Sequence, residues 1–80
     1  QQDQHDQSIE VIRSILDQYP VGIKTSNPNL PTQLAFLNLL LGENYLAQGK
    51  ESLAKEYYQK ALIIKPDFNL AQNKLKELAP

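Results

Sequence analysis

Cysteine, methionine and tryptophan are all absent from this chain of 80 residues, and glycine occurs only three times. Without cysteine the chain forms neither disulfides nor thiolate metal sites. The redox compartment stays open, because a chain without cysteine suits either side of a membrane. The chain begins at Gln1 and contains no methionine, so we expect it to be a domain excised from a longer parent or a processed chain.

An excess of charge of one sign is also absent: eight Lys and Arg nearly balance nine Asp and Glu, and the net charge is −1. This balance gives no electrostatic reason to expect a nucleic acid or an anionic membrane as a partner. The longest strongly apolar run, Leu34 to Leu41, is interrupted by Asn38 and is far shorter than the roughly 20 residues of a membrane-spanning helix. We therefore expect no nucleic-acid partner and no membrane insertion.

Side chains in arrangements suited to catalysis or metal binding are scarce. His5 is the only histidine, and no second metal ligand accompanies it at a matching spacing. The sequence offers no set of nucleophile, base and orienting group, and no glycine-rich phosphate loop. We therefore expect no catalytic residue, no metal and no cofactor. Four lysines at intervals of five interleave with glutamates and are expected to form a solvated face: Lys50, Lys55, Lys60 and Lys65.

The first half of the chain is expected to hold a linker, a helix and a loop. Residues 1 to 7 are polar and are expected to be a disordered or linker segment. From Ser8 to Tyr19 apolar residues recur at helical spacing. Residues 20 to 31 contain three prolines and one glycine and are expected to form a loop. Pro31 suits the first turn of the following helix, where its missing N–H is not needed.

Three further helices follow from the apolar spacing. The second is expected from about Thr32 to Gln48, apolar on more than one face and ended by Gly49 in a left-handed conformation. The third runs from about Glu51 to Ile64 and is stopped by Pro66. Asp67 is expected to cap the fourth. The inward residues of the fourth helix are expected to be Leu70, Ala71, Leu75 and Leu78. The sequence therefore predicts an all-α fold of about four helices in antiparallel hairpins.

A spaced pattern of small and large residues links the second and third helices. It runs Leu41-Gly42-Glu43-Asn44-Tyr45, then Ala54 with Tyr58 four residues on, then Ala61 and Pro66. Gly42 and Ala54 are small enough for the two helices to approach closely, and Tyr45 and Tyr58 fill the space beside them. This pattern resembles the signature of the tetratricopeptide repeat (TPR), Leu-Gly-x2-Tyr, Ala-x3-Phe and a closing Pro. Two positions depart from it: Asn38 stands where the signature has Trp, and Tyr58 where it has Phe.

The resemblance implies an α-solenoid fragment over residues 8–80. Residues 8–19 then form a degenerate half-repeat, 20–31 a loop, 32–66 the full repeat and 67–79 a capping helix, of the kind that closes a repeat stack.

The resemblance also implies a binding surface, because TPR proteins bind peptides or helices on the concave surface made by the first helix of each repeat. Leu39 and Glu43 occupy positions where the chaperone-tail subclass needs Lys and Asn, so no carboxylate clamp is expected. The alternative is that helix 1 or a second chain covers these leucines. The implied partner-binding groove comprises Phe36, Leu39, Leu40, Glu43, Leu70, Asn73, Lys74 and Glu77.

The sequence thus favours an interaction or assembly module without catalysis, with a protein, a peptide or another copy of itself as partner. A homodimer is expected, with helix 1 and the start of helix 2 in the contact, since fewer than three repeats bury a continuous core poorly. The alternative is a non-catalytic C-terminal tail of a larger bacterial enzyme such as a serine hydrolase, because Leu41 to Leu78 resembles repeat tails on some secreted or periplasmic hydrolases. Bacterial cytoplasm and periplasm both remain open.

Overall fold

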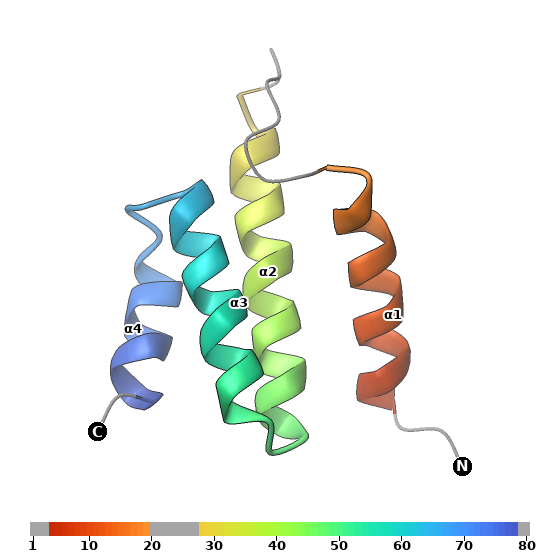
Figure 1. The fold of residues 1–80 in the computed structure, drawn as a ribbon. Coiled ribbons are helices and arrows are strands. Elements are labelled where there is room, and N and C mark those ends of the chain that lie inside the picture. Colours follow the sequence, from red (N-terminus) through yellow and green to blue (C-terminus); the bar gives the residue numbers. More distant parts are fainter. Residues whose placement is uncertain (1–3, 20–27, 79–80) are drawn as a thin grey trace.

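The computed structural model describes residues 4–19 and 28–78, and these residues form four helices (Figure 1). They are α1 (Gln4–Asp17), α2 (Leu30–Ala47), α3 (Glu51–Ile64) and α4 (Asn69–Leu78), and no strand occurs in the described ranges. Each helix runs antiparallel to its neighbour in the sequence, and the four stand side by side in the order α1, α2, α3, α4. The expected all-α architecture of helix hairpins is confirmed.

The α2–α3 hairpin is the centre of the fold, since these two helices share the most extensive contact, while α1 packs on α2 and α4 packs on α3. The layer measures 40 × 32 × 14 Å, so it is thin in one direction. Every helix contributes to one connected core, whose buried members are Ile9, Ile12, Ala35, Leu39, Leu41, Tyr45, Ala54, Tyr58, Ala61, Phe68 and Ala71.

Close approach of α2 and α3 depends on Gly42. A Cβ atom built on Gly42 would lie 2.7 Å from Cε1 and 2.8 Å from Cδ1 of the Tyr58 ring, and 3.1 Å from the Ala54 carbonyl oxygen. Ala54 and Tyr58 have no exposed surface. The expectation that Gly42 faces the third helix is therefore confirmed, and the side chain of Tyr58 takes the space that a larger residue at position 42 would need.

Gly49 ends α2 as expected, with a φ of 79° that only glycine adopts readily. The N–H of Lys50 donates to the Tyr45 carbonyl at 2.9 Å, and the N–H of Gly49 donates to the Leu46 carbonyl at 2.9 Å. This pair of bonds is the Schellman motif, which satisfies the last carbonyl groups of a helix.

Two helix starts lie earlier than expected. α1 begins at Gln4 and not at Ser8, so residues 4–7 of the expected disordered or linker segment are helical, and its residues 1–3 lie outside the described residues. Asp6 suits this first turn because a carboxylate is stabilised near a helix N-terminus, and it also accepts a hydrogen bond from Nε2 of Gln48. α2 begins at Leu30, because the N–H of Gln33 already donates to the Asn29 carbonyl at 3.0 Å.

The expected loop at 20–31 therefore ends before Leu30, and Pro31 lies in the first turn as its fixed φ favours. The part of that expectation that concerns residues 20–27 falls outside the described residues, as does residue 79 of the expected capping helix.

The fourth helix differs from the sequence interpretation in its start and in one of the four residues expected to face inward. It begins at Asn69, and the Phe68 carbonyl accepts the N–H of Gln72 at 3.1 Å, so Phe68 and not Asp67 precedes the first turn. Phe68 and Ala71 are buried, and Leu75 and Leu78 pack against the core, so three of the four expected inward residues are confirmed. Leu70 was also expected to face inward, but it is 51% exposed, because it lies about 100° around the helix from buried Ala71.

Candidate partner-binding face

The eight residues of the implied groove lie on two helices, and we call this set the α2–α4 face. Phe36, Leu39, Leu40 and Glu43 come from α2, and Leu70, Asn73, Lys74 and Glu77 come from α4. Phe36 is 45% exposed and Leu70 is 51% exposed, so both are available to a partner.

Leu39 is the exception on this face. Only 3% of its surface is exposed, and it belongs to the core. The expectation that Leu39 contacts a partner or a second copy is therefore wrong. Leu40 is half-buried and packs against the core while keeping part of its surface exposed.

Helix geometry explains this division. An α-helix turns about 100° per residue, so Phe36, Leu40 and Glu43 lie on the side of α2 opposite to buried Asn38. Leu39 lies at the edge of the buried arc, within reach of the core. The sequence showed that α2 is apolar on more than one side, but it did not show which leucine of the run Leu39 to Leu41 would stay accessible.

An ion pair connects the two helices of the face. Nζ of Lys74 lies 3.4 Å from Oε1 of Glu43, and both side chains are about one third exposed. Such a partly solvated pair contributes little to stability. The pair joins α2 to α4, which otherwise packs on α3. Helix geometry places Leu70 one turn before Lys74, and Leu40 nearly one turn before Glu43.

Tyr58, packed against Gly42 of α2, carries a buried polar atom. Its hydroxyl is buried and has no hydrogen-bond partner among the described residues. Burial raises the pKa of Tyr58 above 10.0, and the carboxylates of Glu43 and Glu77 raise this pKa further. The Tyr58 ring lies against the α2 backbone at Gly42. Sequence reasoning assigned Tyr58 to the core but did not show that its hydroxyl would lack a hydrogen-bond partner among the described residues.

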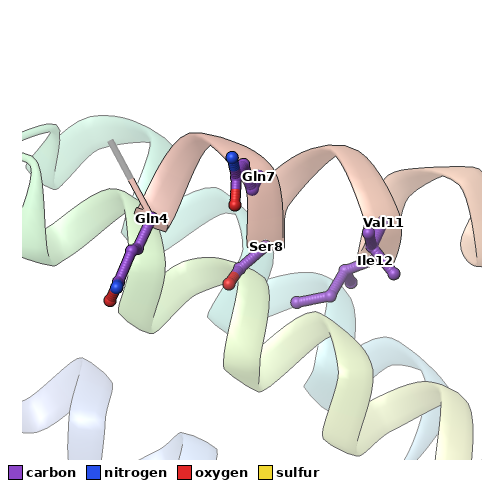
Figure 2. Close-up of a pocket in the computed structure, with 5 residues that line it drawn as sticks. All are labelled: Gln4, Gln7, Ser8, Val11 and Ile12. Carbon is purple, nitrogen blue, oxygen red and sulfur yellow. The ribbon is translucent and has the colours of Figure 1, made fainter. Parts of the chain in front are cut away.

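A second surface feature follows the N-terminal half of α1. It is an open depression of about 500 Å³ lined by Gln4, Gln7, Ser8, Val11 and Ile12. Figure 2 shows these five side chains along one stretch of α1, with Gln4 and Ser8 pointing to the same side. None of the five is ionisable, so the depression offers packing surface and amide or hydroxyl groups and no acid–base chemistry.

The described ranges contain no group of three or more His, Asp or Glu side chains that could hold a metal ion. None of the helices described is long and apolar enough to cross a membrane.

Comparison of the chain with protein-family models, with curated proteins and with solved structures returned no match. The resemblance to the tetratricopeptide repeat accordingly depends on the residues of this chain alone.

Proposed function

We propose that this chain is a protein–protein interaction or assembly module of the tetratricopeptide type, with no catalysis of its own. The observation that carries the proposal is the α2–α4 face, where exposed Phe36 and Leu70 accompany the Glu43–Lys74 ion pair. The repeat type is supported by the close contact of Gly42 with Tyr58 and Ala54, which is the contact that the signature spacing requires.

The residues of this face favour a partner of a particular chemistry. Phe36 and Leu70 offer two apolar anchor points, and truncating such anchors usually costs more binding energy than truncating polar residues at the rim. Glu43 and Glu77 outnumber Lys74, so the face carries one net negative charge. We infer a partner segment that presents apolar side chains together with one basic residue.

The test is selection of peptides from a random displayed library against the whole chain, followed by affinity measurement with synthetic peptides. The double variant Phe36→Ser/Leu70→Ser removes both anchors. The matched control is Val11→Ser, because Val11 is 60% exposed but lies on α1. Selected peptides should bind the double variant at least about tenfold more weakly than the parent, since each tenfold step corresponds to about 1.4 kcal/mol.

Circular dichroism melts should show that both variants keep the fold, because the substituted side chains are exposed. Equal affinity for the parent and the double variant, or an equal loss in Val11→Ser, would contradict the assignment of this face.

A further inference from the structure

The edge helix α1 carries two exposed apolar side chains outside the core. α1 stands at the edge of the layer and packs on α2 (Figure 1). Ile9 and Ile12 are buried and hold α1 against the rest of the fold, whereas Val11 is 60% exposed and Ile15 is 38% exposed. Part of the apolar surface of α1 therefore stays accessible to another molecule.

Val11 and Ile15 belong to a row of residues spaced alternately by four and three positions, which we call the α1 strip. Residues at this spacing lie along one side of an α-helix, as they do in the contact line of two packed helices. All five members are exposed, and the two apolar members lie between polar ones. The α1 strip comprises Gln4, Ser8, Val11, Ile15 and Gln18, the last just beyond the end of the helix.

The acidic and basic residues of α1 lie on other sides of the helix. Arg13 and Asp17 lie about 160° around the helix from Ile15, and Asp6 lies about 140° around it from Val11. Glu10 is the nearest, about 100° from Val11. Because the α1 strip contains no Asp, Glu, Lys or Arg, a second α1 helix can pack on it without bringing like charges together, which would be costly.

The order of residue types along the α1 strip is symmetric about position 13, since polar Ser8 and Gln18 flank apolar Val11 and Ile15 at equal separations. A two-fold axis level with this position and perpendicular to the helix sets two α1 helices antiparallel. Val11 of each copy then lies opposite Ile15 of the other, and Ser8 lies opposite Gln18. Apolar residues meet apolar ones and polar residues meet polar ones, which is the self-complementarity that a two-fold contact requires.

The small side chain of Ser8 leaves room for a neighbouring helix. Gln4, Ser8 and Val11 all line the open depression of about 500 Å³ along α1 (Figure 2). A side chain of a second copy can enter this depression. The hydroxyl of Ser8 and the amide of Gln18 each donate and accept hydrogen bonds, so they can pair with each other across the two-fold axis.

We propose that two copies of this chain associate through the α1 strip, with their α1 helices antiparallel about a two-fold axis level with position 13. The inference rests on the assembly part of the proposed function and leaves the α2–α4 face free for a different partner. Only two apolar side chains of each copy enter the contact. It therefore belongs with the small interfaces, below about 1,200 Å², that are typical of weak and reversible association.

Sedimentation equilibrium of the whole chain at concentrations up to about 1 mM measures this association, since weak contacts have a Kd in the micromolar to millimolar range. The double variants Val11→Glu/Ile15→Glu and Val11→Lys/Ile15→Lys place like charges opposite each other across the axis. Each should dimerise at least about tenfold more weakly than the parent. An equimolar mixture of the two should dimerise again, because each introduced carboxylate then lies opposite an ammonium group, and added salt should weaken the mixed dimer.

A matched control and a measurement without substitutions complete the test. Ile63→Glu is the control, because Ile63 is 66% exposed but lies on α3, and it should dimerise like the parent. Circular dichroism should show that all variants keep their helical content, because the substituted side chains are exposed. Heteronuclear NMR of the parent over a dilution series should show concentration-dependent shifts at the backbone amides of Ser8, Val11 and Ile15.

Four outcomes would overturn the inference. They are a parent that is monomeric at every concentration, double variants that each dimerise like the parent, double variants that fail to associate when mixed, and dilution shifts centred on the α2–α4 face. Binding of selected peptides to the α2–α4 face of a monomeric parent would leave the proposed function intact, so the two claims fail separately.

Discussion

Gly42→Ala tests the close contact of α2 and α3 most sharply. Two effects oppose each other. Alanine in a helix interior is favoured over glycine by about 1 kcal/mol. The added Cβ would lie 2.7 and 2.8 Å from two ring carbons of Tyr58, closer than real Cβ contacts come, and 3.1 Å from the Ala54 carbonyl oxygen. Overpacking of this kind costs about 1–3 kcal/mol.

Relief of this clash is difficult because Tyr58 and Ala54 have no exposed surface. The ring cannot swing into solvent, and the carbonyl belongs to the α3 backbone. We therefore expect the overpacking cost to exceed the helix-propensity gain, with a net destabilisation of about 1–2 kcal/mol. In a domain of this size such a change lowers the melting temperature by about 4–8 °C per kcal/mol.

Urea titration followed by far-ultraviolet circular dichroism measures this change. Gln59 supplies the control, because it is exposed on α3. Comparison of Gln59→Gly with Gln59→Ala gives the propensity difference in this chain without a packing change. If Gly42→Ala were as stable as the parent or more stable, the close packing of Tyr58 on Gly42 would be refuted.

Four further results are expected. Tyr58→Phe removes a buried hydroxyl that lacks a hydrogen-bond partner among the described residues, so urea titration should show stability unchanged or raised by up to about 1 kcal/mol. Burial raises the pKa of Tyr57 and Tyr58 above 10.0. Because the unfolded chain then loses these protons first, stability should fall as pH rises beyond 10.0, and less steeply in Tyr58→Phe. Gly49→Ala should lower the free energy of unfolding by about 1–2 kcal/mol in the same titration, because φ is 79°. The added Cβ meets no atom within 4 Å, so this cost comes from backbone strain and not from a clash. Sedimentation equilibrium over a concentration series should reveal a homodimer, and a monomer at every concentration would contradict self-association.

Sequence reasoning predicted the α2–α3 hairpin well because its determinants are local. Gly49 can end a helix with a positive φ, and the small residues Gly42 and Ala54 permit close approach; both features are read directly from residue type and spacing. The bounds of α3 followed from apolar periodicity and from Pro66.

The less accurate predictions depend on contacts between distant segments. The first turn of α1 is polar, and its hydrogen bond to Gln48 joins residues 42 positions apart. Leu70 was expected to face inward but is exposed, while Ala71, Leu75 and Leu78 pack in or against the core as expected. On the α2–α4 face, Leu39 became core while Phe36 stayed exposed, because the helix neighbours decide which part of an apolar helix is covered. The cleft of about 260 Å³ between α1 and the α2–α3 hairpin, beside Asn38, depends on the position of α1, which the sequence did not show.

The most direct test of the proposed function is the location of a bound peptide. Heteronuclear NMR of the whole chain, titrated with a peptide selected against it, reports which backbone amides change. We expect shifts concentrated at Phe36, Leu40 and Glu43 on α2 and at Leu70 and Lys74 on α4. These shifts should be lost in Phe36→Ser/Leu70→Ser. Shifts confined to α1 and α3, or shifts unchanged in the double variant, would contradict the claim that the α2–α4 face binds the partner.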